Sequence, residues 1–175
     1  MSAQNEPIVI AGLNITTLTL APLRLVKSVW LRASQDKVFS VVADHQQLTE
    51  LLPWVDSVTI DSSAAEVEGG IGTKRTCNFG NGLVLEEEIV GWNPPRMYAY
   101  QGVEATHPFG MKGHVAVVIC EAQADHTMTL TWQHYFDHAN PAAMQERMDD
   151  GMTCVMQRLI KRFGGKLLES YLNFK

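Results

Sequence analysis

Arg75 is the charged side chain whose surroundings most directly suggest chemistry. It lies in a strand-like stretch in which Thr73, Arg75 and Cys77 share one parity. If this parity faces the interior, Arg75 is a buried cation that requires an acidic partner or an anionic or enolate-bearing ligand. The alternative is a surface arginine that pairs with Glu86 or Glu88 on the neighbouring strand.

Glu86, Glu87 and Glu88 form a run of three acids within the next strand-like stretch. Because side chains alternate along a strand, either Glu87 or the flanking pair must face the interior. A carboxyl group in an apolar cavity has a raised pKa and can act as a general acid or base. The alternative is a position at the sheet rim, where an arginine satisfies the carboxylate.

His134 belongs to the stretch with the clearest two-residue alternation. The residues on its apolar face are Met128, Leu130, Trp132, His134 and Phe136. A histidine in this place could transfer protons near neutral pH, or it could be a core histidine bonded to a backbone carbonyl. His114 is a candidate cross-strand partner, although residues 111–121 are apolar on both parities and leave the register open. Tyr98 and Tyr100 share one face of another stretch, where their hydroxyls could serve a ligand or cap the sheet edge.

We expect neither a metal nor a cofactor. Cys77, Cys120 and Cys154 are widely spaced without a C-x-x-C pair, which is typical of free thiols and gives no zinc or disulfide framework. The two candidate histidines lack a third ligand at a fitting spacing. Residues 69–72 are rich in glycine but lack the preceding strand and following helix of a phosphate-binding loop.

The composition is that of an ordinary globular protein, with 46% hydrophobic and 19% charged residues. The net charge of −5 argues against a nucleic acid or an anionic membrane as the main partner. No apolar run approaches the ~20 residues of a membrane span, so we expect no integral membrane association. Glu6 and the lack of a basic residue before residues 8–11 argue against a signal peptide, and we expect a cytoplasmic protein. The sequence carries no signal for an oligomeric state.

The elements that must position these side chains follow from turn residues and periodicity. We expect residues 1–20 to form an N-terminal arm, an extra strand or a frayed tail, and residues 21–175 to form a single domain. A strand over residues 23–31 precedes two short helices, the first capped by Ser34 and the second over residues 46–52. The further strands expected cover residues 54–60, 72–79, 83–92, 96–101, 111–121 and 127–137.

The C-terminal part of the chain predicts one long amphipathic helix from Asn140 to about Leu172. Asn140 suits the N-cap and Pro141 the first helical position. The apolar stripe at three- and four-residue spacing consists of Met144, Met148, Met152, Val155, Met156, Leu159, Phe163, Leu167 and Tyr171. A stripe of this length must lie against a large apolar surface, which only the upstream strands can supply.

The order of elements therefore predicts an α+β fold in which a curved antiparallel sheet of six to seven strands wraps around the C-terminal helix. Such a sheet cannot lie flush on one straight helix along its whole width. We expect a cavity between the sheet and the helix. The methionines on the helix suit walls that accept an irregular apolar ligand.

Several short phrases between residues 23 and 172 carry a family resemblance. They are Leu31-Arg32-Ala33-Ser34-Gln35-Asp36-Lys37-Val38-Phe39, Leu52-Pro53-Trp54-Val55-Asp56-Ser57-Val58, Gly70-Ile71-Gly72-Thr73-Lys74-Arg75, Glu88-Ile89-Val90-Gly91-Trp92-Asn93-Pro94-Pro95-Arg96 and His126-Thr127-Met128-Thr129-Leu130-Thr131-Trp132. In this order they resemble the START-like helix-grip superfamily (SRPBCC), and within it the polyketide cyclase/dehydrase and lipid-transport group. The resemblance implies the helix-grip fold, but it does not determine the function.

The resemblance also implies a ligand pocket between the inner face of the sheet and one face of the long helix. The residues expected to bind a ligand there are Phe39, Trp54, Cys77, Glu87, Tyr98, Tyr100, His114, Met128, Leu130, Trp132, Met152, Met156, Leu159 and Phe163. In cyclases of this group, polar residues on the inner strands orient a polyketone and stabilise enolate oxygens, so Arg75 and His134 are the candidate catalytic residues. The alternative for these positions is a filled core.

Two functions follow as hypotheses. The first is a carrier or sensor that binds a small hydrophobic molecule such as a lipid, a polyketide or an aromatic metabolite. The second is a cyclase, aromatase or dehydratase that needs no cofactor and acts by proton transfer in the same cavity. A weaker third option is an interaction module whose groove holds a partner helix.

Overall fold

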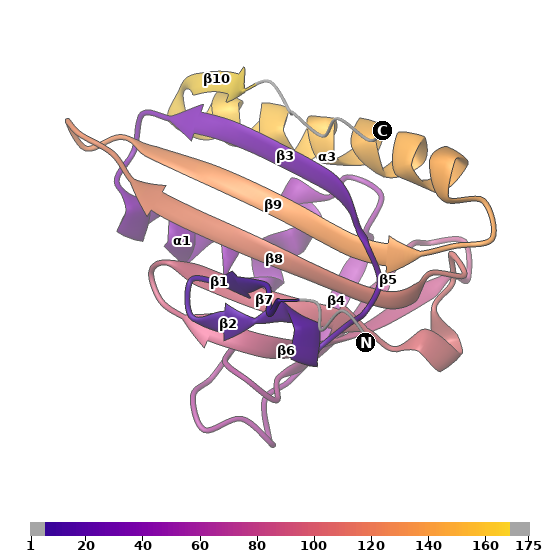
Figure 1. Ribbon diagram of the computed structural model, residues 1–175. Helices are drawn as coiled ribbons and strands as arrows, with labels where there is room; N and C mark the ends of the chain where they lie inside the picture. Colours follow the sequence, from indigo (N-terminus) through magenta and orange to yellow (C-terminus); the bar gives the residue numbers. More distant parts are fainter. Residues whose placement is uncertain (1–5, 169–175) are drawn as a thin grey trace.

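The computed structural model describes residues 6–168 (Figure 1). One large antiparallel sheet has the strand order β10-β3-β9-β8-β7-β6-β5-β4 and is not closed into a barrel. The long helix α3 runs along one face of this sheet (Figure 1). The predicted α+β helix-grip fold is confirmed.

The strands lie close to the stretches that alternation predicted. In chain order they are β1 (Val9–Ile10), β2 (Leu13–Asn14), β3 (Leu23–Leu31), β4 (Ser57–Asp61), β5 (Lys74–Asn78), β6 (Val84–Asn93), β7 (Met97–Gly102), β8 (Lys112–Ala122), β9 (Met128–Asp137) and β10 (Gly165–Leu168). The helices are η1 (Ile15–Thr17), α1 (Gln35–Val42), η2 (His45–Gln47), α2 (Leu48–Leu51), η3 (Glu104–Thr106) and α3 (Pro141–Phe163). The predicted pair of short helices after the first long strand is therefore present as α1 and the η2–α2 segment.

Helix α3 begins as predicted but ends earlier. The Asn140 side chain accepts a hydrogen bond from the Ala143 backbone N–H at 3.3 Å, which caps the helix. The predicted end near residue 172 is wrong, because Gly164 and Gly165 have φ of +71° and +144°, which L side chains rarely adopt. The chain turns there, and Leu167 pairs with Val29 in β10 instead of extending the helical stripe. Residues 171 and 172 lie outside the described part of the chain.

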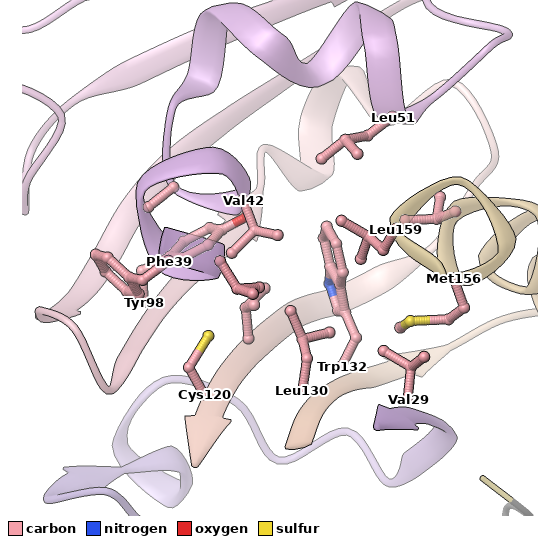
Figure 2. Packing of buried hydrophobic residues seen from close by; sticks show 14 of the residues in the cluster. Val29, Phe39, Val42, Leu51, Tyr98, Cys120, Leu130, Trp132, Met156 and Leu159 are labelled. Carbon is pink, nitrogen blue, oxygen red and sulfur yellow. The ribbon is translucent and has the colours of Figure 1, made fainter. Parts of the chain in front are cut away.

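The C-terminal half of α3 packs tightly against the sheet. Met156 and Leu159 are fully buried in the main core cluster together with Trp132 of β9. Figure 2 shows Trp132 between Leu159 of α3 and Val42 of α1. Phe39 of α1 contributes to the same cluster. Helices α1 and α3 thus close the same face of the sheet around one apolar core.

The N-terminal segment covers the opposite face of the sheet. The hairpin of β1 and β2 lies over that face beside β7 (Figure 1). Ile15 is 1% exposed and belongs to a second apolar cluster with Met97, Val115 and Val117. This cover explains why β8 is apolar on both parities, since His114, Ala116 and Val118 face the helix side while Val115 and Val117 face the hairpin.

Candidate functional site

A cavity of about 400 Å³ lies beneath the N-terminal half of α3. From α3 the walls receive Met144, Arg147, Met148, Gly151 and Met152. The sheet contributes Arg75, Cys77, Leu85, Glu87, Tyr100, His114, Trp132 and His134. Connecting segments supply Leu52, Trp54, Val55, Phe79, Asn81, Leu83, His107, Phe109 and Met111. The helix therefore lies flush on the sheet in one half and stands over a hollow in the other.

The structure brings together only part of the predicted ligand-binding set. Along the cavity lie Trp54, Arg75, Cys77, Glu87, Tyr100, His114, Trp132, His134 and Met152. In the main packed core, away from the cavity wall, lie Phe39, Tyr98, Met128, Leu130, Met156 and Leu159, with Phe163 packed against them. Alternation grouped the residues that share a face of each strand, but it left open which face of residues 72–79 and 111–121 is inside, and it carries no information on how far the hollow extends along that face.

Arg75 is buried and its acidic partner is Glu87. The two residues are directly opposite each other in the β5–β6 ladder, and Arg75 Nε donates to Glu87 Oε2 at 2.6 Å. The Arg75 guanidinium also lies 4.1 Å from the centre of the Tyr100 ring. Of the two orientations that the sequence left open, the structure has the inward one. The alternative of a surface pair with Glu86 or Glu88 is wrong, because those side chains point to the other face of the sheet.

The charges of this pair compensate each other within the wall. Burial opposes the charge on Arg75, but Glu87, together with smaller contributions from Tyr98, Tyr100 and Cys77, holds the Arg75 pKa above its ordinary value. Burial raises the pKa of Glu87, an effect that the Arg75 charge partly offsets. Burial also raises the pKa of the Cys77 thiol to about 12, so this thiol stays protonated. A ligand in the cavity therefore meets little uncompensated charge from these residues.

His45 holds Arg75 from the other side, and sequence reasoning missed it. Its Nδ1 is 3.2 Å from Arg75 Nη1, and its Nε2 is 3.0 Å from the Gly69 carbonyl oxygen. Because a carbonyl can only accept, Nε2 donates and Nδ1 accepts from the guanidinium. Burial and the Arg75 charge lower the His45 pKa to about 4, which keeps the ring neutral. The sequence showed His45 only as the residue that ends the first short helix.

Three histidines along the cavity form a hydrogen-bonded series. His107 Nε2 is 3.2 Å from His114 Nδ1, and His114 Nε2 is 3.2 Å from His134 Nδ1. The partner of His134 is therefore the candidate His114, and not a backbone carbonyl. Burial lowers the pKa of His107 to about 4 and that of His134 to about 3, and it lowers the pKa of His114 well below its ordinary value. All three rings are neutral at physiological pH.

His107 was absent from the predicted set because its Thr-His-Pro context indicates only a turn. The available signal was Gly102, at the end of β7. A Cβ on Gly102 would lie 2.8 Å from His107 Cδ2 and 3.2 Å from His114 Nδ1. Gly151 carries a similar signal in the middle of α3, since a Cβ there would lie 3.1 Å from the Trp54 indole. Both glycines allow a ring to approach the backbone at the cavity.

Tyr100 contributes a hydroxyl to the same wall. The Trp132 indole N–H donates to this hydroxyl at 3.1 Å. Burial raises the pKa of Tyr100 well above its ordinary value, so the hydroxyl keeps its hydrogen. The Tyr98 hydroxyl is buried without a hydrogen-bond partner in residues 6–168, but it lies outside the cavity wall.

No group of three or more His, Cys, Asp or Glu side chains in residues 6–168 is arranged to hold a metal ion. None of the helices in the same residues is long and apolar enough to cross a membrane.

Comparison with known proteins identifies the family and the fold. The model of the family described as polyketide cyclase/dehydrase and lipid transport matches residues 22–164. No curated protein sequence matches significantly. Truncated norcoclaurine synthase from Thalictrum flavum superimposes with a TM-score of 0.62 at 15% identity, covering 90% of this chain and 97% of that chain. The protein XoxI from Bacillus cereus gives 0.68 at 15% identity, with 79% and 94% coverage.

A third similar structure is a two-domain protein. It is the di-domain ARO/CYC protein StfQ from the steffimycin biosynthetic pathway, with a TM-score of 0.63 and 11% identity. The similarity covers 80% of this chain and 49% of StfQ. At these identities the structural likenesses establish the fold alone, and they agree with the START-like resemblance of the sequence.

Proposed function

The chain belongs to the polyketide cyclase/dehydrase and lipid transport family, and from this premise we propose that it binds a small hydrophobic or amphipathic molecule in the cavity beneath α3, as a carrier or sensor. The observation that carries the proposal is the hollow itself. Its volume of about 400 Å³ is within the range of small-molecule sites, and its walls are mainly apolar and aromatic side chains. Of its charged residues, Arg75 and Glu87 pair with each other, while Arg147 is exposed and lies over the Phe109 ring.

The methionines of α3 support an apolar ligand of irregular shape. Met144, Met148 and Met152 all line the cavity, and unbranched thioether side chains adapt to different partners. Trp54 lies at the same wall and is 38% exposed, which gives the cavity an aromatic residue in contact with solvent. A molecule that enters here exchanges water for apolar contacts, which favours binding.

The proposal is tested by the melting temperature in the presence of small aromatic ketones, fatty acids and aromatic hydrocarbons. We expect at least one class to raise the melting temperature, because a ligand that binds only the folded state stabilises it. Met148→Trp and Gly151→Leu place extra atoms in the cavity and should abolish this shift. Leu159→Met changes a core residue away from the cavity with little change in volume and should retain it. If no class shifts the unsubstituted protein, the proposal is wrong.

The second candidate is a cyclase, aromatase or dehydratase that needs no cofactor. Arg75 and His134 at the wall of one cavity favour it, since positioned polar groups can polarise carbonyls and transfer protons. The di-domain ARO/CYC protein StfQ shares the fold. Incubation with a linear polyketone should then give a ring-closed product with loss of water, which mass spectrometry detects. Binding of the polyketone without conversion would exclude the cyclase function and support the carrier or sensor function.

A further inference from the structure

The hydrogen bonds of the histidine series at the cavity all run in one direction, from His107 to His134, and a backbone N–H at His107 fixes this direction. The backbone N–H of Phe109 donates to His107 Nδ1 at 3.4 Å. A backbone amide can only donate, so His107 Nδ1 carries no hydrogen. A neutral imidazole has one N–H, and in His107 it must therefore lie on Nε2.

The same argument passes along the series. His107 Nε2 donates to His114 Nδ1 at 3.2 Å, which leaves the His114 hydrogen on Nε2. His114 Nε2 donates in turn to His134 Nδ1 at 3.2 Å, which leaves the His134 hydrogen on Nε2. The rings of His114 and His134 are nearly parallel, 12° apart, in keeping with one rigid stack. All three histidines thus share the Nε2–H form.

The last donor of the series has no acceptor. His134 Nε2 is buried and has no hydrogen-bond partner within residues 6–168, while the residue is only 3% exposed and lines the cavity. A buried donor without a partner is unfavourable, and native proteins leave few of them. A ligand oxygen next to His134 would remove this defect.

We propose that His134 is a binding residue that donates from Nε2 to a neutral oxygen acceptor, such as a ketone or ester carbonyl, on the ligand in the cavity. His114 and His107 are positioning residues, because they hold the hydrogen of His134 on the nitrogen that needs an acceptor. This inference rests on the proposed function and specifies the chemical class of the ligand.

The charges around the site favour a neutral acceptor over a carboxylate. Arg75 is already paired with Glu87 at 2.6 Å, and the three histidines are uncharged. Arg147 also lines the cavity, but it is exposed, and its guanidinium lies over the Phe109 ring, 5.0 Å from the ring centre. A carboxylate at His134 would therefore lose its hydration without gaining a counter-charge from the buried groups of the wall. A ligand N–H at this position is also disfavoured, because it would face the N–H of His134 and neither group can accept a hydrogen bond.

The test compares three naphthalene probes of similar shape by isothermal titration. They are 2-acetylnaphthalene, 2-isopropenylnaphthalene and 2-naphthoate. In the unsubstituted protein the ketone should bind more tightly than 2-naphthoate. The ratio of ketone to hydrocarbon affinity should fall roughly fivefold in His134→Phe, which is the factor expected for one neutral hydrogen bond. His134→Gln retains a side-chain donor and should keep part of the ratio. His126→Gln, at an exposed histidine of a turn, should leave it unchanged.

The positioning role has its own readout. ¹⁵N chemical shifts of the imidazole nitrogens in the unsubstituted protein should report Nε2–H for His107, His114 and His134. In His107→Phe, His114 loses its donor, so His114 and His134 should show mixed tautomers and a reduced ketone preference. His107→Gln offers a side-chain N–H in place of the imidazole and should restore both the Nε2–H tautomers and the ketone preference.

The outcomes separate this inference from the proposed function. If none of the probes and none of the three ligand classes of the melting test binds, both are wrong. If the probes bind but the ratio is equal in the unsubstituted protein and His134→Phe, the acceptor subsite is overturned while the proposed function stands. Tighter binding of 2-naphthoate than of the ketone also overturns it. Should His134→Phe fail to fold, the tautomer of His134 decides, because a hydrogen on Nδ1 contradicts the series.

Discussion

Buried neutral histidines make the stability of this protein depend on pH. Burial lowers the pKa of His45 and His107 from 6.5 to about 4, and that of His134 to about 3. Between pH 6.5 and about 4 the unfolded chain therefore binds protons that the folded protein does not, and the free energy of unfolding falls as the pH falls. Glu87 acts in the opposite sense, because burial raises its pKa and the folded protein takes up that proton first.

We predict that the free energy of unfolding is highest above pH 6.5 and decreases as the pH is lowered to 5. Each histidine that only the unfolded chain protonates contributes about 1.4 kcal/mol per pH unit. Urea denaturation at several pH values measures the slope. His107→Phe removes one of these groups and should make the slope shallower. An unfolding free energy that stays level from pH 7 to pH 5 would contradict the burial of these rings as neutral groups.

The Arg75–Glu87 pair leads to a second prediction about single residues. Glu87→Leu or Arg75→Met alone leaves a buried charge without its counter-charge and should lower the free energy of unfolding by about 3–5 kcal/mol. The double substitution Arg75→Met with Glu87→Leu should be less damaging than the sum of the two single changes. Urea denaturation of the three variants measures this coupling. Additive effects would mean that the two side chains do not depend on each other.

At the scale of residues, the sequence showed which side chains share a face of a strand, but not always which face is inside. The alternation of Thr73, Arg75 and Cys77 put these residues on one face because strand parity is a local property, whereas the choice between inside and outside depends on what packs against the strand. The partnership with His45 was not predictable, since it depends on how the segment after α1 folds back over β5. His107 was missed for a similar reason, because a turn residue acquires its neighbours only from the register of β7 and β8.

At the scale of elements, the hairpin before β3 has a defined structural role. Ile15 is buried against Met97 and Val115 on the face of the sheet that α3 does not cover. We predict that Ile15→Ala lowers the free energy of unfolding by about 2–4 kcal/mol, in the range of large-to-small core substitutions. Val9→Ala shortens a side chain of the same hairpin that is 58% exposed and should change stability by about 0.5 kcal/mol or less. Equal effects in chemical denaturation would show that the hairpin is not packed on the sheet.

The boundaries of elements were predictable where a local signal ends them. Asn140 and Pro141 located the start of α3 correctly because capping is a local interaction. The end of α3 was misplaced because Leu167 continues the helical spacing of apolar residues. The helix instead ends at Gly164 and Gly165, where the backbone turns, and Leu167 lies in strand β10. Hydrophobic periodicity thus gave the wrong element where two adjacent glycines interrupt it.

At the scale of the whole molecule, the order of elements and the family phrases predicted the fold, and the curvature of the sheet predicted a hollow. The position of the hollow was not predictable. It depends on where the sheet moves away from a straight helix, which is a property of the complete sheet and not of any strand. As a result, the methionines of α3 form one stripe in the sequence but belong to two environments, with Met148 at the cavity and Met156 in the solid core.

This division predicts opposite consequences for two chemically identical substitutions. Met156→Ala removes fully buried atoms from a packed core and should lower the free energy of unfolding by about 2–5 kcal/mol. The affinity of the Met156→Ala variant for 2-acetylnaphthalene should be unchanged, because Met156 does not line the cavity. Met148→Ala should lower stability by about 1 kcal/mol or less, since its side chain already borders empty space, but it should weaken the probe several-fold by removing wall contacts. Urea denaturation and titration calorimetry on both variants measure the two quantities. If the two substitutions have the same pair of effects, α3 does not divide into a packed half and a ligand-facing half, and the proposed binding site loses its wall.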